Sequence, residues 1–319
     1  MARAARLVVL LCALSTPAFA QDTHVLVITG VGGDAEHTAQ FHKWASAIVD
    51  AATQKGGVAD ANIIYLSEKP DQDTSRIRDR STRENVQKAF ADLAMRVRPE
   101  DELFVILIGH GSFDGRVAAF NLPGPDLTAD DYAKLIAKIP AERIVFVNTA
   151  SSSGGFLQAL AGPGRTIVTA TKTGGERNET RFPAYFVEAF QTPAADTDRN
   201  GRVSIAEAFE YARSKVVDAY QKGGFILTEH AALDDGRDGK LAATLFLESA
   251  RARAAATAGV ADPALRALLE EQRKLEDEVA GLKLRKDAID PAEYDRRMEK
   301  LLTDLALKTR QIREREGKK

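Results

Sequence analysis

Cysteine is nearly absent from this chain, which has one in 319 residues. That residue, Cys12, lies in an N-terminal stretch with a basic start, a short apolar run and the motif Ala-Phe-Ala at residues 18–20. These are the features of a secretory signal peptide. We therefore expect residues 1–20 to be removed and the mature chain to be periplasmic or secreted. Without thiols, the mature chain has neither disulfides nor a cysteine nucleophile.

Long apolar runs and excess positive charge are also missing. After residue 20, no stretch approaches the ~20 apolar residues that a membrane-spanning helix needs, so we expect no membrane span. Lys and Arg number 44 against 46 Asp and Glu, and loss of Arg3 and Arg6 with the signal peptide makes the mature chain more acidic. Proteins that bind nucleic acid normally carry a basic patch, so nucleic acid is not an expected partner.

Two apolar stretches end abruptly in small and polar residues. They are residues 101–112 (DELFVILIGHGS) and 143–155 (RIVFVNTASSSGG), and both are typical of parallel strands covered on both faces. Residues 127–139 between them have a helical pattern. A right-handed crossover of this kind brings the carboxyl ends of both strands to the same edge of a sheet. His110 and Ser151 should therefore face one crevice, where open α/β sheets place their sites.

At these residues the sequence resembles the caspase-like peptidases, most closely the legumain branch and its bacterial relatives. That family has His-Gly after one strand and Ala-Cys followed by Ser-Gly after the next. Here His110-Gly111 and residues 150–155 (ASSSGG) stand at these places, and Ser151 replaces the nucleophilic cysteine. The resemblance implies an α/β fold over residues 21–255, a three-layer caspase-like sandwich with a mostly parallel central sheet. It also implies that His110 is the catalytic histidine and that the amides of Gly111 and Ser151 are oxyanion donors.

A serine in place of the cysteine changes the chemistry expected at this site. A hydroxyl needs a base in direct hydrogen-bond contact and usually a third residue that orients the base. Asp114 is a candidate orienting acid near His110, but a polar turn also explains it. Three interpretations stay open. The protein is a pseudo-peptidase that binds a peptide or protein ligand, or it is a peptidase or esterase that uses Ser151, or else Ser152 or Ser153. In the third, the serines merely satisfy free amides of a strand-to-helix turn.

Two loops bear on ligand binding. In the legumain branch, the loop that corresponds to residues 172–181 shapes the pocket for the residue before the cut. The resemblance thus implies that Glu176, Arg177 and Glu179 are pocket residues, although an exposed charged loop is an equal explanation. Residues 30–35 (GVGGDA) nearly fit a dinucleotide-binding fingerprint. No acidic residue closes a second strand about 20 residues later, so we expect these glycines to let a loop turn over the sheet edge.

Residues 196–207 (DTDRNGRVSIAE) fit the twelve-residue calcium loop of an EF-hand at each diagnostic position. Alternate side chains of such a loop converge on one hard cation, and a glycine at the sixth position, here Gly201, allows the chain to reverse. The predicted metal residues are Asp196, Asp198, Asn200, Arg202, Ser204 and Glu207. Because the sequence has one such loop, we expect a structural Ca²⁺ ion. An Asp-rich loop that starts a helix and binds nothing is the alternative.

From residue 262 onward the composition shifts to Leu, Glu, Lys, Arg and Ala. Apolar residues at heptad spacing fill two segments, which a break at residues 287–291 separates. This pattern predicts an antiparallel helical hairpin or coiled coil over residues 262–319. The hairpin either packs on itself or offers an apolar seam to a second subunit or another partner. A coiled-coil assembly scaffold is therefore a further alternative for the function.

Overall fold

The structure is a computed structural model that describes residues 21–236, 241–284 and 289–317. The predicted signal peptide, residues 1–20 with Cys12, lies outside the described residues. Within the described ranges, no helix combines the length and the apolar character that crossing a membrane requires.

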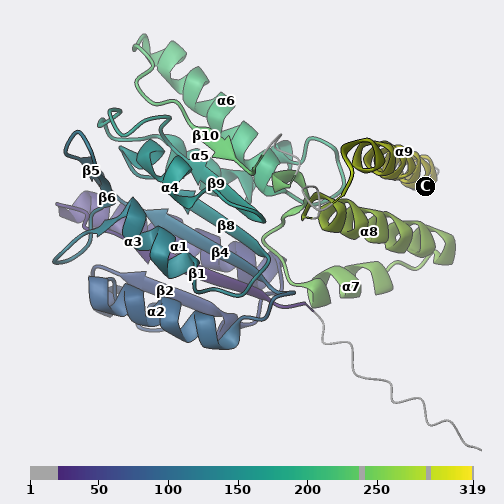
Figure 1. Ribbon diagram of the computed structural model, residues 1–319, viewed down its shortest axis with the longest axis horizontal. Helices are drawn as coiled ribbons and strands as arrows, with labels where there is room; N and C mark the ends of the chain where they lie inside the picture. The colour runs from purple at the N-terminus through teal and green to yellow at the C-terminus, as the bar shows by residue number, and fades with distance from the viewer. Residues whose placement is uncertain (1–20, 237–240, 285–288, 318–319) are drawn as a thin grey trace, which may run out of the picture.

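A seven-stranded sheet forms the centre of the molecule, in the order β10-β9-β8-β4-β1-β2-β3 (Figure 1). All neighbouring strands are parallel except β10, which runs antiparallel to β9. The strands are β1 (Thr23–Thr29), β2 (Ile63–Ser67), β3 (Asp79–Arg80), β4 (Glu102–Ile108), β8 (Arg143–Asn148), β9 (Arg165–Thr169) and β10 (Ala232–Asp234). The predicted α/β fold with a mostly parallel sheet is confirmed.

Helices cover both faces of this sheet and create two apolar cores. On β4 the side chains alternate between them, with Phe104, Ile106 and Ile108 in one core and Leu103, Val105 and Leu107 in the other. The first core includes residues of α1 (Ala35–Asp50), α5 (Phe182–Ala189) and α6 (Ile205–Gly223), and the second includes residues of α2 (Arg83–Arg96), α3 (Ala129–Ile136) and α4 (Phe156–Leu160). Burial on both faces explains why the central strands are continuous apolar runs.

A small antiparallel sheet, β5-β6-β7, begins directly after His110. Its strands are β5 (Gly111–Phe113), β6 (Ala118–Phe120) and β7 (Leu127–Thr128). These strands were not predicted from the sequence, because strands of two or three residues are too short for a periodic pattern. The remaining short elements are η1 (Ala51–Lys55), η2 (Asp60–Asn62), η3 (Pro70–Gln72), η4 (Ser153–Gly155), η5 (Pro193–Ala195), η6 (Ala242–Thr244) and α7 (Ala250–Ala258).

The two C-terminal helices pack against each other in antiparallel orientation. They are α8 (Pro263–Leu284) and α9 (Pro291–Glu316), and their shared apolar cluster comprises Val279, Leu282, Tyr294 and Met298. At the other end of the pair, Arg315 lies 2.6 Å from Asp262. Figure 1 shows α8 and α9 at the opposite end of the molecule from β5 and β6. The predicted helices are present, while a coiled coil stays a prediction.

Candidate functional site

The carboxyl ends of β4 and β8 meet at one edge of the central sheet. The two strands pair directly, with Leu107 opposite Asn148. His110 and Ser151 each follow this register pair by three residues, so both lie at the same edge. The structure therefore brings together the two residues that the sequence predicted to share a crevice.

The hydroxyl of Ser151 is hydrogen-bonded to the backbone of Gly111. Its Oγ accepts the Gly111 N–H at 3.2 Å and donates to the Gly111 carbonyl at 3.1 Å. One of the two amides that the family resemblance implies as oxyanion donors, that of Gly111, is thus bonded to the serine side chain. Among the described residues, no hydrogen bond joins a His110 ring nitrogen to this hydroxyl or to any other group.

The ring of His110 packs against two aromatic rings of α1. The centroids of His37 and Phe41 each lie 5.2 Å from the His110 centroid. His37 in turn contacts two carboxylates, with Nδ1 2.7 Å from Asp34 and Nε2 3.2 Å from Glu179. The hydrogen bond with Asp34 raises the pKa of His37, because it stabilises the protonated ring. A second, carboxylate-bound imidazole therefore lies beside His110.

His37 was not predicted to be a site residue. His37 and His42 are five residues apart, a spacing that does not place two side chains on the same helix face, so the pair gives no signal of a metal site. The useful signal was the position of His37 near the start of a helix that follows β1. In a parallel sheet, that turn lies at the same edge as the turn after β4.

The turn after β8 contains a strained serine. Ser152 has a φ of 57°, in the left-handed region that non-glycine residues rarely adopt. Its Oγ is buried and has no hydrogen-bond partner among the described residues. The next side chain is satisfied, because Ser153 Oγ lies 3.2 Å from Thr171 Oγ1 and accepts the Thr171 N–H at 3.2 Å. Ser153 thus joins this turn to the end of β9.

Gly111 and Gly154 are required because the loops after β4, β8 and β9 pack closely at these two positions. A Cβ on Gly111 would lie 2.2 Å from the Ser151 carbonyl oxygen, and one on Gly154 would lie 2.2 Å from the Thr173 nitrogen. Both neighbours are backbone atoms, so a side chain at either position would force the loops apart. The His-Gly and Ser-Gly pairs therefore have a packing role that is independent of the nucleophile.

Glu176, the first of the three predicted pocket residues, connects its loop to the serine turn. Its carbonyl accepts the Ser152 N–H at 2.8 Å. Its carboxylate accepts the backbone N–H of His230 at 2.8 Å and lies 3.4 Å from the His230 ring. The carbonyl and the carboxylate of Glu176 are therefore both engaged by other groups of the protein.

Arg177 and Glu179, the other two predicted pocket residues, contact groups next to His110. The Arg177 guanidinium lies 5.8 Å from the centre of the Phe113 ring in β5. Glu179 is well exposed and reaches His37. The loop between β9 and α5 thus lies along the edge that holds His110 and Ser151.

A buried carboxylate lies behind this loop. Glu229 is 2% exposed and accepts the Arg181 N–H with both oxygens, at 3.0 and 2.7 Å, where α5 begins. Burial raises the pKa of Glu229 to about 7. The adjacent Thr180 hydroxyl donates to the Thr149 carbonyl at 2.7 Å, which connects this region to the turn after β8. Neither the role of Glu229 nor the strand β10 that follows it was predicted from the sequence.

Asp114 does not orient His110. Its Oδ1 accepts the N–H groups of Arg116 and Val117, each at 2.8 Å, in the turn between β5 and β6. These hydrogen bonds lower the pKa of Asp114. Of the two explanations that the sequence left open, a turn residue is the one that the structure supports.

The glycine-rich turn after β1 is occupied by a carboxylate of the protein itself. Glu68 Oε2 accepts the Gly32 N–H at 3.0 Å and the Thr38 hydroxyl at 3.1 Å. A dinucleotide-binding turn needs such amides free for a pyrophosphate. This contact agrees with the expectation that the glycines serve a loop at the sheet edge.

Three carboxylates of the predicted calcium loop converge. One oxygen from each of Asp196, Asp198 and Glu207 lies within 4.8 Å of the others. Loss of solvation and the neighbouring Glu207 carboxylate raise the pKa of Asp198 to about 6. Gly201 has a φ of 82°, as the tight reversal at the sixth position requires.

Glu207 closes the loop through backbone groups. Its Oε1 accepts the Thr197 N–H at 2.9 Å, and its Oε2 accepts the Ser204 N–H at 2.9 Å. The Ser204 side chain in turn accepts the Glu207 N–H, so this pair forms the capping box of α6. Asn200 Nδ2 donates to the Asp198 carboxylate at 3.0 Å. The predicted ligand side chains of Asp198, Asn200, Ser204 and Glu207 are therefore held by one network.

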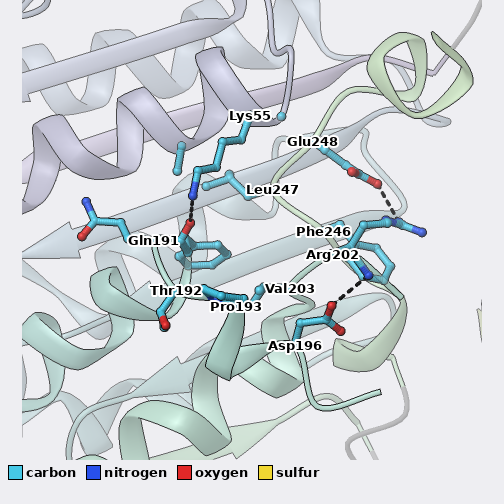
Figure 2. A pocket seen from close by; sticks show the side chains of 14 residues that line it. Lys55, Gln191, Thr192, Pro193, Asp196, Arg202, Val203, Phe246, Leu247 and Glu248 are labelled. Carbon is cyan, nitrogen blue, oxygen red and sulfur yellow. Dashed lines mark hydrogen bonds and ion pairs between the residues drawn. The ribbon is translucent and has the colours of Figure 1, made fainter. Parts of the chain in front are cut away.

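The side chain of Arg202 points away from the loop. Its guanidinium lies 2.6 Å from Glu248, 3.1 Å from Glu276 of α8 and 3.4 Å from the centre of the Phe246 ring. Figure 2 shows Arg202 lying across Phe246 and reaching Glu248. At the seventh position of a calcium loop the ligand is the backbone carbonyl, so this orientation leaves the ligand role intact.

Helix α9 also contacts the predicted calcium loop. The Arg313 guanidinium donates to the backbone carbonyl of Asp198. A hollow of about 330 Å³ adjoins the loop, and its lining includes Asp196, Arg202, Phe246 and Glu248 (Figure 2). The loop is thus connected to both helices of the C-terminal pair.

Comparison with known proteins bears out the family resemblance. Residues 81–231 match the model of the Peptidase C13 family. The match includes His110, Gly111 and Ser151, the loop before α5 and the predicted calcium loop. Over these residues the chain therefore matches the Peptidase C13 family, the legumain family of caspase-like peptidases.

Among solved structures, the chain is similar to protein GSU0716 from Geobacter sulfurreducens, with a TM-score of 0.43 and 12% sequence identity. That similarity covers 67% of this chain and 92% of the other. No curated protein matches the chain.

Proposed function

We propose that the mature chain is an exported, legumain-like pseudo-peptidase that binds a peptide or protein ligand. The ligand would lie at the edge formed by His110, Ser151 and residues 172–181. The main support is the double hydrogen bond between Ser151 Oγ and the Gly111 backbone, at 3.2 and 3.1 Å. Serine catalysis needs the hydroxyl to donate to a base and the oxyanion amides to be free. Here the hydroxyl instead donates to the Gly111 carbonyl, and the Gly111 amide donates to the hydroxyl.

Two charged residues form the rim of this edge, Arg177 and Glu179. Their contacts within the protein are weak, so contacts with a ligand can replace them. Glu179 and Arg177 carry opposite charges and contact His37 and Phe113 respectively. Exposed pairs of this kind contribute between about 0 and 1 kcal/mol, so a bound segment can replace them at little cost. An extended peptide with charged side chains of both signs is the ligand that this rim favours.

A fluorophosphonate probe tests the absence of catalysis. Such a probe reacts with a serine that a neighbouring base activates. We expect no labelling of the mature chain above that of the heat-denatured protein, because the Ser151 hydroxyl donates to a carbonyl. Labelling that disappears in Ser151→Ala but persists in Ser153→Ala would contradict the proposal. It would favour the serine hydrolase instead.

Selection from a displayed random-peptide library tests the binding role. Arg177→Ala with Glu179→Ala removes both rim charges, and neither side chain is buried. We expect selected peptides to bind the wild-type chain at least about tenfold more tightly than this double variant, since a pair of charged contacts supplies about 1.4 kcal/mol or more. Exposed Asp130→Asn on α3 is the matched control. Peptides that bind all three proteins equally would place the binding surface elsewhere.

A serine-dependent peptidase or esterase is the alternative function. The observation that favours it is the left-handed backbone of Ser152, whose buried hydroxyl has no hydrogen-bond partner in the described part of the chain. Strained residues of this kind cluster at active sites. Labelling that is lost in Ser152→Ala and retained in Ser151→Ala would assign this role to Ser152.

We also propose that residues 196–207 bind one structural Ca²⁺ ion. The convergence of three carboxylates and the left-handed Gly201 support this proposal. Calcium takes six to eight oxygen ligands, and exported proteins meet it in abundance. The proposed ligands are the side chains of Asp196, Asp198, Asn200 and Glu207, the carbonyl of Arg202, and Ser204 directly or through water.

A further inference from the structure

The outer face of α9 carries an exposed apolar stripe. Leu302 is 39% exposed and Leu307 is 52% exposed, whereas the opposite face of the helix packs on α8 through Tyr294 and Met298. The stripe comprises Glu299, Leu302, Thr303, Ala306, Leu307 and Arg310. Steps of three and one residues place all six on one side of the helix.

The order of residues along this stripe is self-complementary. An antiparallel copy of the same helix, centred between residues 304 and 305, places each residue of the stripe opposite another one. The pairs are Glu299 with Arg310, Leu302 with Leu307, and Thr303 with Ala306. Apolar side chains then meet at the middle, the two small residues let the helices approach, and opposite charges meet at both ends. A two-fold interface requires this arrangement, because each contact occurs twice.

We propose that the outer face of α9 binds the same face of a second copy of this chain, in antiparallel orientation. The four helices of the two C-terminal pairs then form a bundle, in which α9 packs on α8 with one face and on its counterpart with the other. Opposed helix dipoles add to the charge complementarity of the ends.

The size of the stripe sets the strength of this dimer. Residues 299–310 span about 18 Å of helix, so the contact falls short of the roughly 1,200 Å² that stable interfaces bury. Beyond the stripe, the same register would place Asp295 near Glu314 and Arg296 near Arg313. These like charges limit the contact to its central turns, where crossing helices are closest. We therefore expect a reversible dimer with a dissociation constant of about 10 to 500 μM.

Sedimentation equilibrium of the full mature chain with Ca²⁺, from about 1 μM to 1 mM, measures this dimer. We expect a monomer–dimer equilibrium that Leu307→Glu weakens at least tenfold, because one substitution puts two charges into the centre. Met95→Glu is the control, since Met95 is 79% exposed on α2 and lies outside the stripe. A wild-type chain that stays monomeric overturns the proposal, and so does a dimer that Leu307→Glu leaves unchanged.

Charge exchange tests the register. Glu299→Arg places two arginines together at each end of the interface, and Arg310→Glu places two glutamates there. Each single variant is expected to weaken the dimer several-fold, and the double variant is expected to restore it. Far-ultraviolet circular dichroism checks that each variant keeps its helices. Single variants with the wild-type dissociation constant, or a double variant as weak as the singles, would overturn the antiparallel arrangement.

Discussion

Calcium is expected to raise the melting temperature of the mature chain by about 5 to 10 °C. A ligand present at a hundred times its dissociation constant stabilises the folded state by about 2.7 kcal/mol, and for a domain of this size each kcal/mol shifts the midpoint by about 2 to 4 °C. The ion would neutralise the three carboxylates that converge at Asp196, Asp198 and Glu207. Thermal unfolding in a chelator, and then in excess Ca²⁺ or Mg²⁺, measures the effect.

The variant Asp198→Asn should distinguish stabilisation by bound calcium from stabilisation by the loop's own hydrogen bonds. Without calcium, this variant is expected to melt at the same temperature as the wild type or higher, because it relieves repulsion with Glu207 and its amide oxygen can still accept hydrogen bonds. With calcium, we expect it to lose more than half of the wild-type increase. Asp130→Asn on α3 should behave as the wild type in both conditions. A wild-type midpoint that does not change up to about 10 mM calcium would contradict the proposed site.

Folding stability is expected to fall by about 3 kcal/mol between roughly pH 4.5 and pH 7 through the titration of Glu229. Its pKa rises from an ordinary 4.5 to about 7 in the folded chain, because its carboxylate is buried. In this window the unfolded chain has released the proton and the folded chain still holds it. Stability is therefore highest below the unfolded pKa and decreases until the pH exceeds the folded pKa, at about 1.4 kcal/mol per unit of pKa difference.

Glu229→Gln tests this pH dependence. The amide keeps an acceptor for the Arg181 N–H but carries no charge, so we expect it to flatten this part of the profile and to stabilise the chain above about pH 7. Urea unfolding of both proteins at about pH 5 and pH 8 gives the difference in the free energy of unfolding. The exposed Glu270→Gln on α8 is the matched control. Equal stability differences at the two pH values would refute the role of burial at Glu229.

The central strands could be predicted because a continuous apolar run in the local sequence marks each of them. β4 and β8 are buried on both faces, so each contains a continuous apolar run, residues 103–108 and 144–147 respectively. Turns that begin at His110 and Ser151 follow the carboxyl ends of these strands. β10 escaped prediction because it is an edge strand of three half-buried residues in an acidic segment. Its pairing with β9 depends on a partner more than 60 residues earlier, which no local pattern reveals.

The candidate site could be predicted in its position but not in its contacts. Parallel topology placed His110 and Ser151 at one edge, and loop spacing indicated the residues that we propose as calcium ligands. The hydrogen bonds of Ser151 with Gly111 depend on how closely two loops approach, which the tertiary packing decides. The same is true of His37, whose position beside His110 follows from the packing of α1 against the sheet.

The proposed calcium loop contacts the C-terminal helices, so binding of the ion and docking of these helices on the domain would depend on each other. Glu276 of α8 holds the side chain of Arg202, and Arg313 of α9 holds the carbonyl of Asp198. If the ion orders these two positions, it also favours the arrangement in which α8 and α9 lie against the domain. Thermodynamic reciprocity then requires that a force or a truncation that detaches the helices lowers the affinity for the ion by the same factor. The C-terminal helices would thus contribute to the free energy of cation binding, although none of the proposed ligands lies in them.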